Sequence, residues 1–395
     1  MIVTLGSAGA TYGGLTGKSG KDFGHGQGRY VAFTEVMADA RLVGNSLERV
    51  DVRKGERQNE VSRGDVLFNG SSETPEEVAL GAVVDFDVPQ GVYLNSFCFG
   101  YRLTRPGLID PTYLSYFFRS SVGREIVSGL AQGSTRYNIA KAKLLRVPLS
   151  LPSFEEQNAA ATALTQVDDL IAQIALVIAK KRAIKQGMMQ ELLTGRTRLP
   201  GFSGEWRVRR LGEVLKFQVG YPFSSGYFTD VPSGVRLVRN RDLRAEDAVV
   251  YYAGPFASEY LLADNDMLVG MDGDFEPVIW RGGRALLNQR VGRLRMSTAA
   301  SDSFLSHALV RPLKTLEGET GATTVKHLSH QDVESIAMPL PSRDEQDAIG
   351  RVLDDAEAEV FCLEARLTAT CAIKRGMMQE LLTGRTRLVP TEAPA

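Results

Sequence analysis

The sequence has few of the residues that mark secreted, metal-binding and membrane proteins. Its 395 residues include three cysteines, Cys98, Cys362 and Cys371, which are odd in number, scattered and without a CxxC pair. This argues against a disulfide framework and a zinc site. No apolar run approaches the roughly 20 residues that span a bilayer, and no basic, then apolar, leader opens the chain. A cytoplasmic protein without a membrane partner is the simplest interpretation.

An excess of charge of one sign is also lacking. The chain has 46 basic and 47 acidic residues, a formal net charge of −1. A protein that attracts nucleic acid through its overall charge is strongly basic, so a DNA site here must come from local arrangement. The remaining composition, 43% apolar and 24% charged, is that of a globular protein with room for two or three domains.

What the sequence does contain is a long internal repeat. The segment GMMQELLTGRTRL stands at Gly187–Leu199 and again, unchanged, at Gly376–Leu388. The same offset aligns two further blocks: AIK at residues 183–185 and 372–374, and LPSFEEQ at residues 151–157 with LPSRDEQ at residues 340–346. The repeat therefore extends well beyond the identical segment.

Between these blocks, both copies carry apolar residues in steps that alternate four and three. Such a heptad stripe is typical of a helix–helix seam. The seam candidates are Leu164, Val167, Ile171, Ile174 and Ile178 in the first copy, and Leu353, Val360, Leu363 and Leu367 in the second. In a single helix such a stripe is more often plain core. The repeated flanks favour two long helices that pack on each other as a coiled coil.

Matching signals mark both ends of each predicted helix. Capping boxes at Ser153-x-x-Glu156 and Ser342-x-x-Glu345 each follow a proline, and Gly195 and Gly384 stand where C-terminal glycines belong. The signals predict helices near residues 153–194 and 342–383. At 1.5 Å per residue each helix is on the order of 60 Å long.

The segments that precede the two helices form a second, weaker repeat. Matched pairs include Gly64–Phe68 with Asn265–Val269, Leu94-Asn95 with Leu287-Asn288, Tyr113–Ser115 with Phe304–Ser306, and Gly133–Thr135 with Gly321–Thr323. Alternating apolar runs predict short strands, including part of Val36–Val52, and helical patches fall near Pro111–Leu130 and Ser301–Leu309. The first segment lacks a counterpart of Trp206–Arg210.

The two repeats together predict an α/β fold. Two similar mixed α/β domains are separated by two long antiparallel coiled-coil helices, related by a pseudo-two-fold axis, because a domain's ends usually lie close together. The predicted division is residues 1–150 for the first domain, 151–195 for the central helix, 196–339 for a turn-rich linker and the second domain, 340–388 for the C-terminal helix and 389–395 for a tail. Two similar domains with divergent surfaces suit the reading of two different half-sites on DNA.

This ordered combination resembles the specificity subunits of type I restriction–modification enzymes. YGGLTGKSGKDFG at Tyr12–Gly24, the LPSFEEQ and LPSRDEQ blocks and the repeated tails carry the resemblance, which covers essentially the whole chain. It implies recognition of a bipartite, asymmetric site in double-stranded DNA, one half per domain. It also implies docking of two adenine methyltransferase subunits on the helices, with restriction subunits joining that core.

The segment GGLTGKS at residues 13–19 is similar to an ATP-binding loop, but its spacing is wrong. A GxxxxGK[ST] loop needs glycine at position 12, where Tyr12 stands. We interpret the segment as a polar loop at a DNA backbone, with a plain surface loop as the alternative. Its DNA-binding candidates are Thr16, Lys18, Ser19 and Lys21; further candidates in the first domain are Ser71, Ser72, Thr74, Arg136, Tyr137 and Asn138.

In the second domain, the candidates gather around an arginine-rich stretch. No acidic residue occurs between Pro277 and Ser301, and arginine binds phosphate as a fork and pairs bidentately with guanine. The candidates here are Arg281, Arg284, Arg290 and Arg293, followed by Arg239, Asn240 and Arg241. A merely solvated basic face is the alternative. Asp272 and Asp274 could accept from cytosine amino groups or could equally belong to a turn.

The repeated tails are the candidates for partner docking. They are Met188, Met189, Leu192 and Leu193, with their copies Met377, Met378, Leu381 and Leu382. His327-x-x-His330 has a spacing that could ligate metal, but without neighbouring ligands a solvated pair is favoured. We predict a non-catalytic subunit without cofactor or metal. The alternatives are a nucleotide-dependent enzyme that uses residues 13–19, and a coiled-coil scaffold that does not bind DNA.

Overall fold

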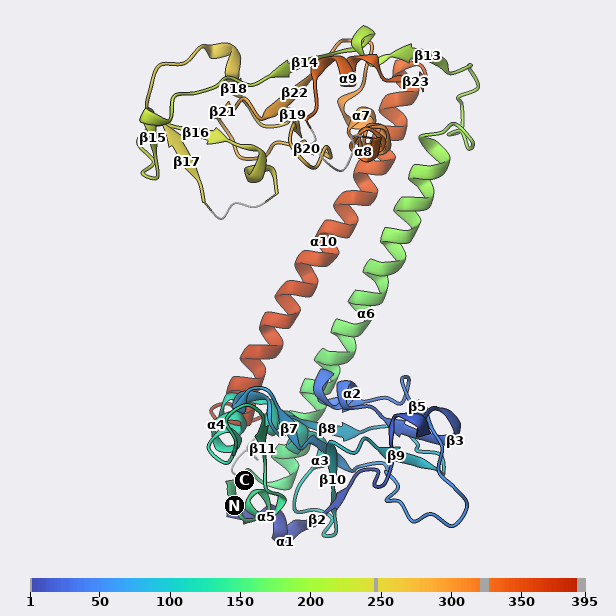
Figure 1. The fold of residues 1–395 in the computed structure, drawn as a ribbon, viewed down its shortest axis with the longest axis vertical. Helices are drawn as coiled ribbons and strands as arrows, with labels where there is room; N and C mark the ends of the chain where they lie inside the picture. The colour runs from blue at the N-terminus through green and yellow to red at the C-terminus, as the bar shows by residue number, and fades with distance from the viewer. Residues whose placement is uncertain (1, 245–247, 320–326, 389–395) are drawn as a thin grey trace, which may run out of the picture. The chain divides into compact units, whose positions relative to one another are not determined.

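The computed structural model describes residues 2–244, 248–319 and 327–388 (Figure 1). The chain forms two compact units, residues 1–175 with 366–395, and residues 176–365. Each unit contains one domain and a part of each long helix, α6 (Phe154–Leu192) and α10 (Arg343–Leu382). The two predicted helices are confirmed to within two residues at each end. The predicted tail, 389–395, and the repeat segment 321–323 lie outside the described residues.

The first domain is built on a five-stranded sheet of order β2-β10-β6-β8-β4 and a three-stranded sheet of order β5-β3-β9. Its strands are β1 (Ile2–Thr4), β2 (Gly9–Gly13), β3 (Phe23–Val31), β4 (Arg41–Leu42), β5 (Glu48–Val50), β6 (Val66–Asn69), β7 (Ser71–Ser72), β8 (Gly81–Val84), β9 (Val92–Leu94), β10 (Cys98–Leu103), β11 (Tyr137–Asn138) and β12 (Pro148–Ser150). Its helices are α1 (Leu5–Ala8), α2 (Phe33–Ala38), α3 (Pro111–Arg119), α4 (Ser121–Ser128) and α5 (Lys141–Arg146), with short 3-10 turns η1 (Gly20–Asp22) and η2 (Pro75–Glu77).

The second domain has sheets of order β14-β22-β19-β20 and β15-β17-β16-β21-β18. Its strands are β13 (Arg207–Arg210), β14 (Leu215–Val219), β15 (Phe228–Thr229), β16 (Val235–Val238), β17 (Val250–Tyr252), β18 (Leu261–Leu262), β19 (Met267–Gly270), β20 (Pro277–Ile279), β21 (Ala285–Leu287), β22 (Val291–Met296) and β23 (Ala337–Leu340). Its helices are α7 (Asp302–Ala308), α8 (Val310–Glu319) and α9 (His330–Ser335), with 3-10 turns η3 (Leu211–Glu213), η4 (Ser225–Tyr227), η5 (Asn240–Leu243) and η6 (Ser258–Tyr260).

The two domains share one strand order. The run β2-β10-β6-β8 corresponds to β14-β22-β19-β20, and the parallel pair β3–β9 flanked by β5 corresponds to β16–β21 flanked by β17. The first domain adds β4, whereas the second adds β15 and β18. This confirms the weak repeat and the mixed α/β class of both domains.

The matched residues of the weak repeat have matched roles. Gly64 and Asn265 precede the equivalent strands β6 and β19, and their φ angles are 84° and 75°. Glycine and asparagine are the residues that accept this left-handed conformation most easily, which explains their exchange. The carbonyls of Leu94 and Leu287 likewise accept equivalent backbone bonds, of 2.8 Å from Leu15 and 3.0 Å from Tyr221.

One sequence prediction needs correction. Ile2–Thr4 forms β1, which pairs with β12 as β13 pairs with β23. The first domain therefore does contain a short counterpart of Arg207–Arg210. The prediction of strand in part of Val36–Val52 is confirmed by β4 and β5, while Val36 itself lies in α2 and is buried there.

The predicted heptad stripe coincides with the least exposed positions of α6 and α10. Leu164, Ile174, Ile178, Leu353 and Val360 are buried, and the other stripe positions are half-buried. The outermost members pack in the domain cores rather than in a seam alone. Leu164 belongs to the apolar core that includes α3, and Leu353 to the one that includes α7.

Ion pairs fix the direction of the helices within each unit. In the first unit, Asp168 on α6 lies 2.5 Å from Lys374 on α10, and Glu156 lies 3.4 Å from Arg387. Lower numbers on one helix thus meet higher numbers on the other. The second unit repeats this, with Lys181 2.7 Å from Glu359 and Lys185 3.2 Å from Glu357, so the helices run antiparallel within each unit.

The LPSFEEQ and LPSRDEQ blocks anchor each long helix to its domain. The amide of Gln157 accepts a bond of 3.0 Å from the backbone N–H of Asp110, which caps α3. The amide of Gln346 accepts one of 2.9 Å from the N–H of Ser301, which precedes α7. Both glutamines are buried. A buried amide must find partners, so this residue fixes the angle between loop and helix.

By length and composition, α6 alone among the described helices is apolar enough to cross a membrane. Its apolar residues include the periodic stripe, and several of its positions carry charged groups that form ion pairs with α10. The stripe residues of α6 are buried or half-buried, whereas its other apolar residues include the exposed Leu170, Leu176, Val177 and Ile184.

Candidate nucleic-acid interface

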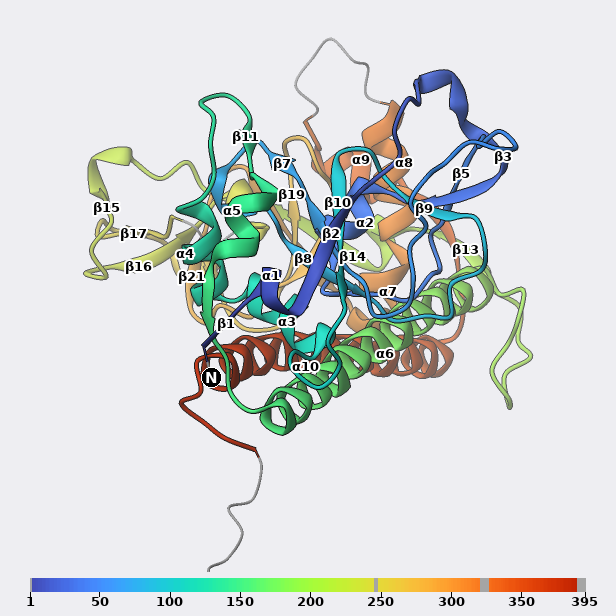
Figure 2. The same ribbon diagram turned by 90° about the horizontal axis from the view of Figure 1, so that it is seen from below.

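Two segments predicted to bind DNA meet in the first domain. β7 and β11 pair antiparallel, with Ser71 opposite Asn138 and Ser72 opposite Tyr137 (Figure 2). Both serines are buried, and Ser72 Oγ donates a 2.9 Å bond to Glu77. The serines therefore support the strand pair, while Arg136 and Asn138 are exposed beside it. Thr74 is exposed just before η2.

Phe97 joins this surface, although the sequence analysis missed it. Its carbonyl accepts a 2.8 Å bond from the N–H of Gly70, whose own carbonyl accepts one of 3.2 Å from Ile139. The guanidinium of Arg136 lies 5.3 Å from the centre of the exposed Phe97 ring. An isolated aromatic residue in a turn carries no periodic signal. We call Ser71, Ser72, Phe97, Arg136 and Asn138 the first candidate site.

In the second domain, Asp272 contacts two side chains that are distant from it in the sequence. Its Oδ1 accepts a 3.2 Å bond from Arg290 Nη1 and lies 3.1 Å from His327 Nδ1. His327, interpreted from sequence as half of a solvated pair, therefore contacts the predicted DNA-binding residues, whereas His330 lies exposed at the start of α9. We call Asp272, Arg290 and His327 the second candidate site.

The two sites occupy the same position in the two domains. The N–H of Met271 donates to the carbonyl of Arg290 at 3.0 Å, and the N–H of Leu328 donates to Met271 at 2.9 Å. Gly70, Phe97 and Ile139 make the same two bonds in the first domain. Arg290 thus stands where Phe97 stands, in surroundings of different charge.

Asp274 lies in a turn, which is one of the two alternatives that the sequence left open; the other was contact with a cytosine amino group. Gly273 has a φ of 87°, and Asp274 Oδ1 accepts a 3.2 Å bond from the N–H of Glu276. Its carboxylate also pairs with Arg244 and lies 3.9 Å from Lys314. The bond to Glu317, together with the charge of Asp274, raises the pKa of Lys314.

Several predicted arginines are engaged within the protein. Arg293 has a side chain that is only 5% exposed and lies 3.0 Å from Asp266, so its prediction as a DNA contact is wrong: β22 turns it inward. Arg239 is held by Asp242 at 2.8 Å. Arg281 donates to Asn265. The amide of Asn240 donates a 2.7 Å bond to the carbonyl of Asp272, and Arg241 and Arg284 are exposed.

The loop at residues 13–19 does not present Lys18 to a ligand. The ammonium of Lys18 lies 2.7 Å from Glu56, and its side chain is 4% exposed. This ion pair lowers the pKa of Glu56 to about 2. The loop is followed by η1 rather than by the α-helix that a phosphate-binding loop requires. The prediction of Lys18 as a DNA contact and the nucleotide alternative are both contradicted.

The neighbours of Lys18 in this loop have different surroundings. Thr16 accepts and donates bonds with Gln58, and Ser19 forms a capping box with Asp22. The bond from the Ser19 backbone lowers the pKa of Asp22. Thr16, Ser19 and Lys21 are exposed.

One group in the second unit has the residue types of a metal site. Ligand atoms of His307, Asp354 and Glu357 lie within 4.8 Å of one another. Asp354 already bonds His307 at 2.8 Å and Ser303 at 2.5 Å. The first unit has Tyr116 bonded to Asp168 at 2.6 Å in the corresponding place. The hydrogen bonds of this group therefore link the domain helix α7 to the long helix α10.

The predicted docking residues are partly buried. Leu192, Leu381 and Leu382 lie in the domain cores, and Met188, Met189, Leu193, Met377 and Met378 pack against those cores. The prediction that the apolar residues of the tails form a docking surface is therefore wrong for the three leucines. Each tail packs in the core of one domain, with Leu192 in the second domain and Leu381 and Leu382 in the first.

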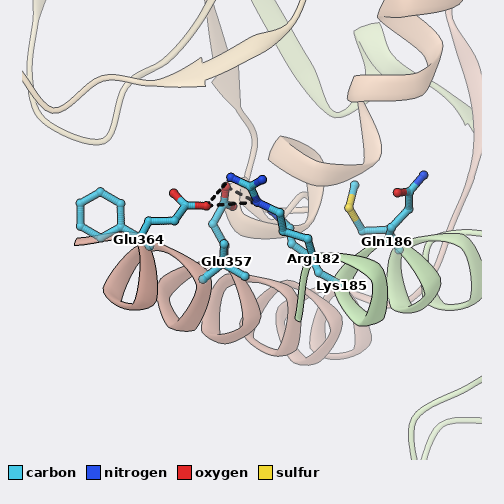
Figure 3. A pocket seen from close by; sticks show the side chains of 8 residues that line it. Arg182, Lys185, Gln186, Glu357 and Glu364 are labelled. Carbon is cyan, nitrogen blue, oxygen red and sulfur yellow. Dashed lines mark hydrogen bonds and ion pairs between the residues drawn. The ribbon is translucent and has the colours of Figure 1, made fainter. Parts of the chain in front are cut away.

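The exposed surface of the helices includes a hollow of about 480 Å³ in the second unit. Arg182 faces Glu364 across it, with Arg182 Nη2 2.6 Å from Glu364, and Lys185 pairs with Glu357 (Figure 3). The exposed ring of Phe361 forms one wall.

Comparison with known proteins shows what these two domains belong to. A family model described as "Type I restriction modification DNA specificity domain" matches residues 58–180 and 203–370, one match in each half of the chain. The chain belongs to this family. The resemblance to type I specificity subunits that the sequence indicated is therefore confirmed, and so is the predicted fold class.

Relatives within the specificity family match different lengths of the chain. The EcoBI specificity subunit of Escherichia coli is 35% identical over 185 residues, 46% of this chain and 39% of that protein. The match thus spans well under half the length of that relative. The putative MjaX specificity subunit of Methanocaldococcus jannaschii is 24% identical over 95% of this chain and 90% of that protein.

Among solved structures, the S subunit of a type I restriction–modification system from M. genitalium has a TM-score of 0.62 at 15% identity. It covers 96% of this chain and 95% of its own. At this identity the likeness shows the fold alone.

Proposed function

We propose that the chain is the DNA sequence-recognition subunit of a type I restriction–modification complex. Each domain reads one half of a bipartite, asymmetric site in double-stranded DNA, and the chemistry is carried out by partner subunits in the cytoplasm. One observation carries this proposal: the first and second candidate sites share a backbone framework but differ in their side chains. Such divergence at a shared position suits two surfaces that read different sequences.

Base reading and positioning on DNA would fall to different residues. The exposed arginines Arg241 and Arg284 and the exposed Lys21 suit phosphate contacts, which orient a protein without reading sequence. The side chains of the two candidate sites combine donors, acceptors and an aromatic ring, which suit base edges.

We further propose that two methyltransferase subunits dock on the long helices, with restriction subunits joining that core. Ile184 and Ile373 occupy the same place in the repeat and are 45% and 59% exposed. Each is followed by a lysine that pairs with an acidic residue of the other helix, Lys185 or Lys374. Two copies of one exposed apolar residue beside one repeated ion pair suit two copies of one partner.

The test is single-molecule methylation mapping of DNA from cells that carry the chain with its neighbouring methyltransferase. Matched cells lack the chain. We expect a bipartite adenine-methylation motif that disappears with the chain. Replacement of residues 205–339 by those of another family member should change one half of the motif and leave the other half intact. A methyltransferase that is active without any motif dependent on the chain would overturn the proposal.

A further inference from the structure

We propose that Arg290 reads a guanine in the half-site bound by the second domain, and that Asp272, itself contacted by His327, holds its guanidinium for that purpose. This inference rests on the proposed function and adds a base identity to one half of the recognised site. Arg290 lies in the turn between β21 and β22. This turn begins at Leu287-Asn288, the counterpart of Leu94-Asn95, and a strand holds it at each end.

The contacts of Arg290 leave one edge of its guanidinium available. Nη1 donates to Asp272 at 3.2 Å and lies 3.4 Å from His327 Nδ1. In the part of the chain that the structure describes, Nε and Nη2 have no hydrogen-bond partner, and the side chain is 52% exposed. These two atoms are adjacent, parallel donors with a fixed spacing.

Guanine presents the matching pair of acceptors. O6 and N7 lie side by side on its major-groove edge, and a bidentate bond from arginine is the commonest specific contact to that edge. An arginine already held by a carboxylate has lost side-chain freedom before binding, so less entropy is lost when the base is bound. Asp272 can also accept from the amino group of a cytosine in the same or the next base pair.

A phosphate contact fits the same group less well. The carboxylate of Asp272 lies within hydrogen-bond distance of Arg290, which makes the pair nearly neutral and would repel a phosphate oxygen. By contrast, the exposed Arg284 belongs to the same domain and forms no ion pair with an acid among the described residues. Arg284 is therefore the matched control for a contact that depends on charge alone.

The equivalent position in the first domain cannot read guanine in this way. Phe97 has no donors, and its ring is covered on one side by Arg136. An apolar ring at a major-groove edge suits a thymine methyl group instead. The two half-sites should therefore differ at the position that these two residues contact.

The experiment uses the full chain with its methyltransferase and maps methylation in cells with Arg290→Lys, Arg290→Gln and Arg284→Lys. We expect a guanine in one half of the wild-type motif. Arg290→Lys keeps the charge but loses the fork, so it should relax that position and weaken binding of the purified complex to the original site by about 10- to 100-fold. Arg290→Gln should shift the preference at that position from guanine toward adenine, because glutamine pairs with adenine N6 and N7. Arg284→Lys should leave the motif unchanged.

Asp272→Asn tests the positioning role separately. It removes the charge that holds Arg290, so it should relax the same position as Arg290→Lys while the other half of the motif stays intact. That intact half also shows that each variant is folded and assembled.

Two results would overturn the inference while the proposed function stands. One is a bipartite motif that keeps its guanine in both Arg290 variants. The other is an Arg290→Gln complex whose affinity falls equally for all sequences, with the slope of binding against salt reduced by about one, which would identify a phosphate contact. A wild-type chain that directs no motif would instead contradict the proposed function itself.

Discussion

Arg198 donates hydrogen bonds from Nε and Nη2 to the two carboxylate oxygens of Glu345, at 2.5 and 2.6 Å. Arg198 is the last residue but one of the first repeated tail, and Glu345 lies in the first turn of α10, where the sequence predicted a full capping box. Ser342 still accepts a 3.4 Å bond from the N–H of Glu345. The carboxylate of Glu345 bonds Arg198 instead of the N–H of Ser342, so only one of the two bonds of the capping box is formed. In the first unit, Glu156 completes its box with Ser153 and also pairs with Arg387.

Arg198→Met should destabilise the second unit by about 3 kcal/mol, because it leaves the buried carboxylate of Glu345 without its partner. The matched variant is Arg387→Met. Arg387 is largely exposed and Glu156 keeps its bonds to Ser153, so this change should cost less than about 1 kcal/mol. Urea unfolding of both variants measures the difference. Equal losses would contradict the assignment of a buried ion pair to Glu345.

Gln157→Leu should loosen the start of α3. The change removes the bond to the N–H of Asp110 and the bonds to the carbonyls of Leu108 and Pro152, all in a buried site. Leaving these groups unpaired should cost about 3 kcal/mol. Hydrogen exchange should rise in residues 108–119.

Gln346→Leu is the matched variant in the second domain, where it should raise exchange in residues 299–308 and leave residues 108–119 unchanged. A rise in both regions from either variant would show that the glutamines do not act locally.

The three cysteines should react in an order set by burial. Burial raises the pKa of the Cys98 thiol to about 12, whereas Cys362 is exposed and Cys371 half-buried. At pH 8, iodoacetamide should therefore modify Cys362 first and leave Cys98 unmodified, because the thiolate is the nucleophile. Mass spectrometry of the alkylated peptides, with and without urea, checks the order. Rapid labelling of Cys98 in the native protein would contradict the packing of β10 against β6.

The Lys18–Glu56 ion pair should contribute stability that is lost in acid. Glu56 has a pKa of about 2 in the folded chain against 4.5 for the unperturbed group. A lowered pKa means that the contribution is fully present above about 4.5 and is lost as the pH falls toward 2. Lys18→Met should therefore lower the urea midpoint at pH 6 but have a smaller effect at pH 3. Lys21→Met, which changes an exposed lysine of the same loop, should change neither value.

Ile184→Asp and Ile373→Asp should each remove one methyltransferase subunit from the complex, and the double variant should remove both. A charge at the centre of an apolar contact is desolvated without a partner, which weakens binding strongly. Native mass spectrometry of the co-expressed complex reads the stoichiometry directly. Leu176→Asp is the control, since Leu176 is exposed on α6 but has alanine at its repeat position. Unchanged stoichiometry in the double variant would place the docking surface elsewhere.

The sequence was sufficient for features that depend on local periodicity or on repetition. The stripe from Leu164 to Ile178 and its copy follow from the 3.6-residue turn of a helix, so the extents of α6 and α10 could be predicted closely. The repeat of Gly64–Phe68 as Asn265–Val269 predicted two similar domains because both segments meet the same backbone requirement.

Side-chain direction could not be predicted in the same way. Lys18 and Arg293 have the residue type and setting of DNA contacts, yet each is turned to a carboxylate, Glu56 or Asp266, that lies far away in the sequence. The tail leucines looked like a free apolar surface because the residues that bury them come from distant parts of the chain.

The sequence by itself thus determined the family, the internal repeat, the long helices and the class of both domains, because each of these leaves a pattern in consecutive residues. The tertiary structure decided which polar residues come together: Phe97 with Arg136, and Asp272 with Arg290 and His327. The physical reason is that strand order brings turns from distant parts of the chain to one edge of a sheet, and pairing across that edge is a property of the fold rather than of any segment.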